Sequence, residues 1–408
     1  MIPRIRLVVF SLLFITTAVV CASAQDSDPD ETTGRFRLGP LRFTPSIALT
    51  NLGVDDNVFN DDTDPKSDTT GGLGPAVNLW MRVGRSRLNG QVSGQYVYFR
   101  EYENQRSWST TDQLKWEFPL GRVTPFIAGS YANTRTRPGF EIDSRAHQIA
   151  QAVTVGTTVT LSGVTSLMLA GARSSVRFDE NETFAGADLA QALNGTQQTE
   201  SLQLRLRLTP LTTFVVGADA LQDRLDEASI RNANSIRVMP GFELKPAALI
   251  SGRVLVGFRR FDALSSRVPD YQGVIADVGA TYIAGATKFV LRVSRDLNFS
   301  FEETDPYYAL TDLGLTITQR MGRGWDVMAR GGRQTLAYRQ LAAPVLAPER
   351  RPRTDVVRQY GGGFGYRVGR IMRIGLDAIY YRRNSTQVAD RDFTGFRYGL
   401  SISYGMPQ

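Results

Sequence analysis

The side chains that could carry out catalysis are few in this chain of 408 residues. His147 is the only histidine, and Asp143 and Ser144 lie close to it in the sequence. A histidine that activates a serine or works with an aspartate is a common catalytic pair in hydrolases. These residues define one hypothesis, a hydrolase. The alternative is a histidine that only forms hydrogen bonds.

Oxygen ligands for a cation gather in residues 55–68, where aspartate recurs. The segment lacks the glycine and the closing glutamate of an EF-hand loop, so a solvated acidic loop is the alternative to a Ca²⁺ site. One histidine and one cysteine, Cys21, are too few for a transition-metal site. The glycine run at residues 361–365 has no helix after it to hold a phosphate. The sequence predicts no cofactor and no metal, and leaves Ca²⁺ binding by residues 55–68 open.

The start of the chain has the features of a secretory signal. A basic segment precedes an apolar run over residues 7–20, and Ala22-Ser23-Ala24 follows as an A-x-A cleavage site. We expect cleavage after Ala24, which removes Cys21 and leaves no cysteine for a disulfide. Val20 makes Cys21 a poor site for lipid attachment. The sequence therefore predicts an exported protein.

The elements that must position any site are strands. In Ser201–Leu208 (SLQLRLRL), leucine occupies one face, and Gln203, Arg205 and Arg207 occupy the other. The same period of two recurs at residues 77–83, 88–98, 236–244, 372–380 and 396–404, and it is less regular at 167–178. Amphipathic helical patterns are nearly absent. The chain is predicted to be one all-β unit.

The connections between these strands alternate between short and long. Short turns are predicted at residues 84–87, 119–122, 161–164, 209–212, 246–248, 285–286, 320–324 and 369–370. Longer polar loops are predicted between them, at residues 55–68, 103–108, 136–144, 179–196, 226–231, 265–270, 300–306, 339–353 and 385–391. This pattern predicts about eighteen strands, in a range of roughly sixteen to eighteen.

Such an alternation is typical of a transmembrane antiparallel β-barrel, with short periplasmic turns and longer extracellular loops. A sheet that spans lipid must close, because lipid cannot satisfy the hydrogen bonds of a strand edge. We predict a signal peptide at residues 1–24, a short periplasmic segment at 25–42, a transmembrane barrel at 43–404 and a tail at 405–408. A secreted β-sandwich or solenoid is the alternative, but neither requires the regular alternation of turns.

In a barrel, the polar face of each strand points into the lumen. The predicted pore-lining residues are Arg82, Arg205, Arg207, Arg237, Arg253, Arg259, Arg292, Arg330, Arg373 and Arg397, together with Lys115, Lys245, Arg320 and Arg367. The predicted inward acids are fewer: Glu117, Asp219, Glu243, Asp277, Asp296, Asp312, Asp326 and Asp377. Rings of like charge set selectivity in pores, whereas opposite charges can pair along the wall. We expect both, with an excess of positive charge in the lumen.

The last strand is similar to the assembly signal of outer-membrane barrels. In Arg397–Tyr404, Gly399 is followed by alternating apolar and aromatic positions that include Ile402 and Tyr404. The chain departs from the common form because four residues follow Tyr404 and no aromatic residue is terminal. We predict that Gly399, Ile402 and Tyr404 form an insertion signal.

A family resemblance begins at the first strand. Gly39-Pro40-Leu41-Arg42-Phe43-Thr44-Pro45-Ser46, followed by Asp55-Asp56-Asn57-Val58-Phe59, resembles the opening of the type-2 beta-barrel porins of Gram-negative bacteria. Some members of that family are associated with exopolysaccharide export. The resemblance implies an outer-membrane pore or export channel and no catalytic residue.

Two functions remain open on this basis. The first is a channel for polar, predominantly anionic solutes or polysaccharide. The second is a structural or adhesive barrel with a plugged lumen, and a barrel-embedded hydrolase is a weaker third. The predicted partners are outer-membrane lipid and lipopolysaccharide, the outer-membrane insertion machinery and components of polysaccharide export. The net charge of +7 could indicate nucleic acid, but export to the outer membrane removes that partner.

Overall fold

The computed structural model describes residues 35–246, 248–342, 352–369, 371–388 and 391–405. The predicted signal peptide with Cys21, most of the segment 25–42 and the end of the tail lie outside these ranges. None of the helices in the described residues is long and apolar enough to cross a membrane.

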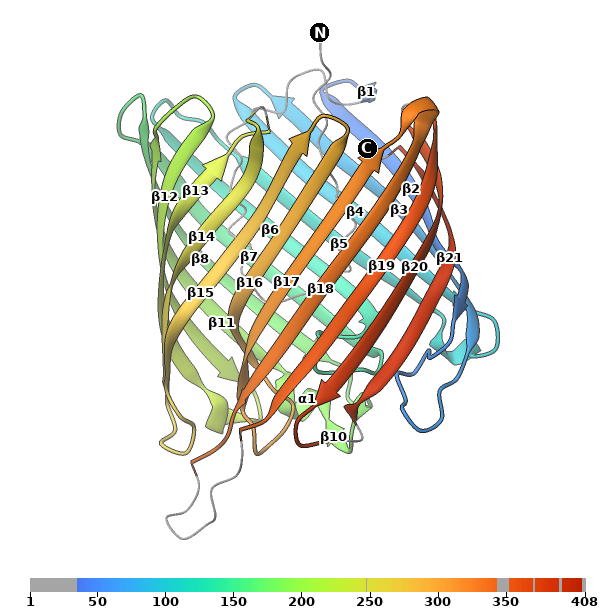
Figure 1. The fold of residues 1–408 in the computed structure, drawn as a ribbon. Helices are drawn as coiled ribbons and strands as arrows, with labels where there is room; N and C mark the ends of the chain where they lie inside the picture. The colour runs from blue at the N-terminus through green and yellow to red at the C-terminus, as the bar shows by residue number, and fades with distance from the viewer. Residues whose placement is uncertain (1–34, 247, 343–351, 370, 389–390, 406–408) are drawn as a thin grey trace.

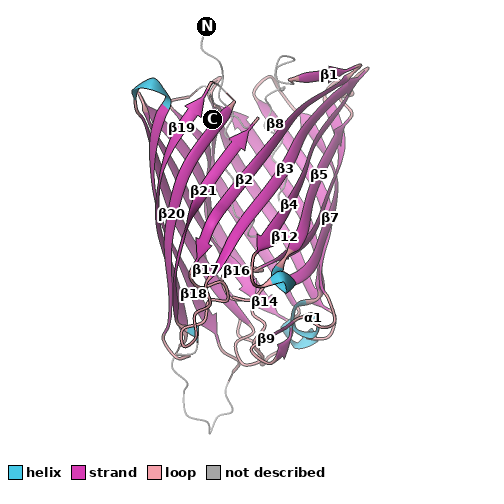
Figure 2. Cartoon of the chain, turned by 90° about the vertical axis from the view of Figure 1, so that its right-hand side faces the viewer, coloured by secondary structure: helices cyan, strands magenta, loops and turns pink. Residues whose placement is uncertain are grey.

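Eighteen antiparallel strands of the described residues form one closed barrel (Figures 1 and 2). They are β2 (Leu41–Asp55), β3 (Asp68–Val83), β4 (Ser86–Phe99), β5 (Ser107–Glu117), β6 (Val123–Thr136), β7 (Ala146–Thr160), β8 (Thr165–Phe178), β11 (Gly195–Arg207), β12 (Thr212–Leu225), β13 (Ala233–Leu244), β14 (Ile250–Ala263), β15 (Tyr271–Ala284), β16 (Thr287–Phe299), β17 (Tyr307–Arg320), β18 (Trp325–Arg339), β19 (Thr354–Val368), β20 (Met372–Ser385) and β21 (Phe393–Tyr404). The predicted fold and strand number are confirmed.

Short turns lie at one rim of the barrel and long loops at the other, as the sequence pattern predicts. The short-turn rim also carries β1 (Phe36–Leu38), which pairs with β2 through a turn where Gly39 has φ 58°. The long-loop rim carries the small elements η1 (Glu103–Gln105), β9 (Thr183–Phe184), β10 (Ala187–Asp188), α1 (Leu189–Leu193) and η2 (Ser229–Arg231). Figure 1 places α1 and β10 at the rim opposite β1. A further single turn, η3 (Gly322–Gly324), joins β17 to β18.

The two faces of the wall follow from exposure and contacts. Leu202 and Leu204 are 45% and 41% exposed, whereas Gln203 between them is only 7% exposed. On the Gln203 face, Arg237 of β13 contacts Asp296 of β16, three strands away, at 3.4 Å. Side chains of strands that are not neighbours can meet in this way only on the concave inner side of a barrel. The leucines of β11 therefore face outward, toward lipid.

The outward face carries an apolar band next to the short-turn rim. On β19 the outward residues from 360 to 368 are Tyr360, Gly362, Phe364, Tyr366 and Val368. A segment of this length fits a tilted strand that crosses the hydrocarbon core. Beyond Tyr360, toward the long loops, the outward residue is Arg358. The strands therefore extend past the apolar band on the long-loop side.

The barrel closes at a seam between β2 and β21, where the register shifts between Leu49 and Leu52. Here the backbones approach so closely that a Cβ atom on Gly53 would lie 2.0 Å from the carbonyl oxygen of Tyr398. A Cβ atom on Gly399 would lie 2.9 Å from the backbone of Leu52. Gly399 therefore has a packing role at the seam, while its role as an insertion signal, with Ile402 and Tyr404, stays a prediction.

Candidate channel and its long-loop mouth

The lumen wall carries a ladder of ion pairs on β11–β16. Arg237 pairs with Asp219 at 2.6 Å, and Arg259 contacts Asp296 at 2.7 Å and Asp223 at 3.6 Å. Closer to the short turns, Arg253 pairs with Asp277 at 2.7 Å, and Arg205 pairs with Glu243. These groups line an internal cavity of about 380 Å³, except for Arg205 and Glu243, which lie beside it. The wall is therefore braced by ion pairs where arginine and acid alternate across strands.

The other predicted pore-lining arginines fall into two groups. Arg373 shares Asp326 with Arg367, at 2.8 and 2.9 Å, and Arg397 donates from Nε to Asp55 at 2.9 Å. No ion pair to Arg82, Arg207 or Arg330 is found among the described residues, while Arg207 donates to the carbonyl of Gly163. The strand register places Arg292 on the same inward face, opposite Gly279 and Gly314.

Several inward charges escape the sequence analysis because they lie at strand ends. Asp55 is the last residue of β2, although the run of acids after it suggests a loop. Asp223 and Asp355 are 4% and 0% exposed, and Arg383 of β20 is 0% exposed. Lys245, in contrast, is predicted to line the pore from a strand but lies in the turn after β13, which ends at Leu244. Near the end of a strand, too few alternating residues remain for the sequence to distinguish a strand from a loop.

Near the short turns, inward basic side chains outnumber inward acids. We call this group the basic rim; it comprises Arg42, Arg82, Arg87, Lys115, Arg205, Arg207, Lys288, Arg320, Arg367 and Arg373. The inward acids at the same level are Glu117, Glu243 and Asp326. Asp326 serves two arginines at once. The lumen is therefore most positive at its short-turn end.

The opposite end of the lumen is crossed by the loop between β6 and β7, residues 137–145, here called the inner loop. Arg383 of β20 donates from Nη1 to the carbonyl oxygens of Phe140 and Glu141, at 3.0 and 3.1 Å, and to Asp143 at 2.7 Å. Strands β2–β5 and β21 separate β6 from β20 around the ring. The inner loop therefore reaches Arg383 only by crossing the mouth of the barrel.

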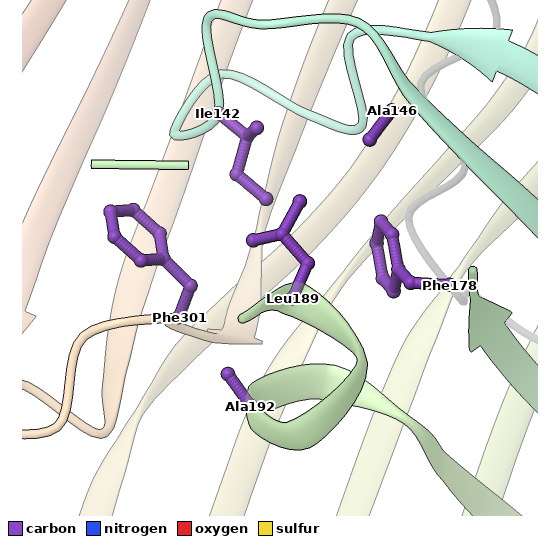
Figure 3. Packing of buried hydrophobic residues seen from close by; sticks show 6 residues of the cluster. All are labelled: Ile142, Ala146, Phe178, Leu189, Ala192 and Phe301. Atoms are coloured by element: carbon purple, nitrogen blue, oxygen red, sulfur yellow. The ribbon is translucent and has the colours of Figure 1, made fainter. Parts of the chain in front are cut away.

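Other long loops hold the inner loop from the far side. The hydroxyl of Ser300 donates to Glu141 at 2.6 Å. Ile142 lies in an apolar cluster with Leu189 of α1 and Phe301 (Figure 3). Arg231 donates to the carbonyls of Ala192 and Glu302 at 3.1 and 2.8 Å, which joins three loops. The described loops thus form a packed assembly at the mouth.

One buried carboxylate anchors this assembly to the wall. Asp355 accepts hydrogen bonds from Arg353, at 2.9 and 3.1 Å, and from Arg383 at 2.6 Å. The guanidinium of Arg353 also lies 4.2 Å from the centre of the Tyr338 ring. The side chains of Arg353, Asp355 and Arg383 are at most 2% exposed. Buried charges need this degree of pairing.

Comparison with known proteins agrees with this architecture. The model of the family described as "Putative beta-barrel porin 2" matches residues 28–404. The chain belongs to this family. No curated protein matches the sequence. A member of this family whose described residues close into a barrel of eighteen strands is a porin-like channel of the outer membrane, with short periplasmic turns and long extracellular loops.

Solved porins show a general likeness to this beta-barrel porin. A BenF-like porin from Pseudomonas fluorescens Pf-5 is 11% identical over 89% of this chain and 98% of its own, with a TM-score of 0.45. OpdK from Pseudomonas aeruginosa, solved with vanillate, is 10% identical over 89% and 97% of the two chains, with a TM-score of 0.46. At these values the likeness supports no argument about cargo.

Within this porin, the two longest predicted loops, at residues 179–196 and 339–353, have different outcomes. The loop between β8 and β11 does reach inward, because Leu189 is fully buried in the cluster with Ile142. The loop between β18 and β19 is described only at its ends, residues 340–342 and 352–353. The inner loop is predicted as a long connection at residues 136–144, but its course across the mouth is not predicted. Its signal is the placement of apolar Phe140 and Ile142 in an otherwise polar connection.

The hydrolase hypothesis finds no support in the geometry of the porin. Nδ1 of His147 lies 2.6 Å from Asp179, and Nε2 lies 2.7 Å from Asn133. Asp143, its neighbour in sequence, instead binds Arg383. Both ring nitrogens are therefore used in contacts with an acid and an amide at the long-loop rim. Family and fold indicate a channel.

The acidic segment 55–68 uses its carboxylates to order the backbone. Asp61 accepts the backbone N–H groups of Thr63 and Asp64 at 2.9 and 3.1 Å, and Asp68 accepts those of Glu101 and Tyr102 at 3.1 Å. The described residues contain no group of three potential ligands that could hold a metal ion. Asp61 and Asp68 therefore use carboxylate oxygens to bind the protein's own backbone N–H groups.

The inner loop should respond to pH through its acids. Burial raises the pKa of Glu141 to about 7, from an ordinary value of 4.5, and burial also raises the pKa of Asp143. Between pH 4.5 and about 7, Glu141 keeps a proton in the folded state that it has lost in the unfolded state. The free energy of unfolding therefore falls as pH rises. The stabilisation by protonated Glu141 is complete below about pH 4.5 and is lost as pH rises through about 7. We expect a higher thermal transition at the acidic end of this window, measured by the heat-dependent gel mobility of the barrel.

The variant Glu141→Gln separates the contribution of this one residue. Glutamine keeps an oxygen that can accept from Ser300 but cannot ionise, so it should flatten most of the pH dependence. Glu103→Gln in the exposed element η1 is the control and should leave the pH dependence intact. An unchanged pH dependence in Glu141→Gln would show that Glu141 does not control the loop.

Proposed function

We propose that this porin passes anionic solutes, including acidic polysaccharide, across the outer membrane, and that the basic rim is the mouth that attracts them. The observation that carries the proposal is the unequal distribution of inward charge. Farther from the short turns, arginines pair with nearby acids, whereas at the short-turn rim the bases outnumber the acids. A positive mouth with low-dielectric walls concentrates anions from the periplasm.

The inner loop determines the size of the solutes that pass through the proposed channel. It restricts the extracellular mouth, so small anions should pass through the resting protein, and a polymer should pass only after the loop has moved. The same packing supports the alternative function, a structural or adhesive barrel with a closed lumen. Glu141 and Ile142 are each only 2% exposed, which is unusual for a loop that leaves a pore open.

Conductance in planar lipid bilayers tests the proposal. In a salt gradient, the reversal potential should indicate a preference for anions. The preference should weaken at high salt, because the Debye length falls from about 10 Å at 0.1 M to about 3 Å at 1 M. A conducting pore that prefers cations would refute the electrostatic argument. Absence of any conductance would favour the closed, structural barrel.

Two substitutions in the basic rim should change the selectivity directly. Arg82→Gln with Lys288→Gln removes two inward charges and leaves no acid of the described residues without its ion-pair partner. The reversal potential should shift toward cations, while the barrel stays folded. The control, Arg173→Gln with Arg382→Gln, removes the same charge from exposed positions on the outward face. An equal shift in the control would show that the selectivity does not arise in the lumen.

A further inference from the structure

An aromatic row marks the extracellular edge of the apolar band on three neighbouring strands. Tyr360 of β19 lies directly opposite Tyr380 of β20, which lies opposite Phe396 of β21. Their side chains point outward and are 56%, 38% and 40% exposed. Aromatic rings favour the level of the lipid headgroups. This row therefore locates the boundary between hydrocarbon and headgroups on this side of the barrel.

A row of arginines lies one outward position beyond the boundary. Arg333 of β18 is directly opposite Arg358 of β19, and Arg358 is directly opposite Arg382 of β20. Like charges in directly opposed positions destabilise a sheet. Three in succession are therefore unfavourable unless a negative group lies between or above them.

No acidic side chain of the described residues supplies that negative group. Arg358 makes one long hydrogen bond, from Nη1 to the amide oxygen of Asn384 at 3.5 Å. The acid at the adjacent rim, Asp392, instead accepts from Asn384 and from the backbone N–H of Ser385. Asp355 and Asp377 belong to the inward face of the same strands. On the outward face of β17–β21, the described residues include no aspartate or glutamate.

The guanidinium groups of the arginine row and its position beside the headgroup boundary indicate which ligand it binds. Guanidinium groups bind phosphate through two parallel hydrogen bonds, and neighbouring strands are about 4.8 Å apart, so the row offers donors over about 10 Å. The aromatic row and the apolar band below it offer a surface for acyl chains. We propose that Arg333, Arg358 and Arg382 bind the phosphate groups of lipopolysaccharide in the outer leaflet. This site is independent of the proposed anion channel.

Arg295 of β16 marks one end of the site. It occupies a comparable outward position, but its guanidinium donates to the carbonyl of Val274 at 3.1 Å and to the hydroxyl of Thr311 at 2.6 Å. Thr311 and Leu313 occupy the intervening strand β17. On the other side, the outward residue opposite Arg382 is Thr394. The site therefore spans β18–β20.

Binding of purified lipid A to the detergent-solubilised barrel tests the proposal. The probes are lipid A with two phosphates, lipid A with its phosphates removed, and phosphatidylglycerol with one phosphate. The test variant is Arg333→Gln/Arg358→Gln/Arg382→Gln. The matched control is Arg85→Gln/Arg122→Gln/Arg323→Gln, which removes the same charge from exposed short turns. Native mass spectrometry measures the bound lipid, and a titration gives the affinity.

The proposal requires the parent protein to bind bisphosphorylated lipid A more tightly than the other two lipids. The test variant should lose about tenfold or more in affinity, since each basic group near an anionic lipid contributes about 1 kcal/mol. The control should bind as the parent does. Without lipid, the test variant should be at least as stable as the parent, because a like-charge repulsion has been removed.

Three results would overturn the proposal. The first is equal binding of lipid A with and without phosphate. The second is equal affinity in the parent and the test variant. The third is an equal loss in the control, which would indicate attraction by net charge alone. Because the lipid-free stability is measured separately, a folding defect in the test variant would itself contradict the unfavourable charge row on which the proposal rests.

Discussion

Replacing residues 138–144 of the inner loop with a short Gly-Ser linker is expected to raise the single-channel conductance several-fold. The reason is geometric: a barrel of about sixteen to eighteen strands leaves an aqueous channel unless loops fill it, and this loop crosses the mouth from β6 to β20. Its removal also frees Arg383 and Arg391 from Asp143. The anion preference should therefore increase together with the conductance.

The control for this experiment is the same linker in place of the exposed element η1. That replacement should leave conductance unchanged, since the hydrogen bonds and the ion pair of η1 among the described residues join it only to residues 101–106. Heat-dependent gel mobility establishes that both variants form barrels. If removal of the inner loop leaves the conductance unchanged, the narrowest point of the lumen must lie at the ion-pair ladder of β11–β16 instead.

Asp355→Ala should have the largest effect on stability of any single substitution in the described ion pairs. It leaves Arg353 and Arg383 buried without their shared carboxylate, and removal of one partner of a buried pair costs about 3–5 kcal/mol. Asp226→Ala is the control, because Asp226 and its partner Arg177 are each more than 40% exposed. Such an exposed pair contributes about 0–1 kcal/mol.

Denaturant unfolding of the purified barrel measures both free energies. Because Arg383 also holds the inner loop, the less stable Asp355→Ala variant should conduct more than the parent at equal amounts of folded protein. Equal losses of unfolding free energy in Asp355→Ala and Asp226→Ala would mean that water reaches the Asp355 cluster. The ion pairs of the mouth would then not hold the loops in place.

The barrel could be predicted from sequence because its determinants are local. Leu202 and Leu204 alternate with Gln203 and Arg205 within one short segment, and lipid on one side imposes that alternation on every strand. The short turns follow from the same pattern, since the apolar band ends next to the short-turn rim. The strand number and the difference between the two rims can be predicted without knowing which distant residues are in contact.

The mouth could not be predicted in this way. Phe140 and Arg383 are 243 positions apart, and no local periodicity connects them. Asp355 resembles a loop residue in the sequence because the segment before it is polar, yet it is fully buried. The contacts of the inner loop depend on the closed ring, in which five strands separate β6 from β20. The sequence pattern specifies the wall, while the closed ring determines which loops meet across it.

The seam between β2 and β21 has a consequence for the order of assembly. Each of the other strand pairs of the barrel joins neighbours in the chain, so the contact order of the wall is low except at this one join. Ile47 pairs with Tyr404, nearly the full length of the barrel sequence away. Until β21 has been synthesised and exported, β2 presents an unpaired edge that lipid cannot satisfy. We therefore propose that insertion is not completed strand by strand during translocation, and that a chaperone or an insertase covers the edge of β2 until the last strand arrives.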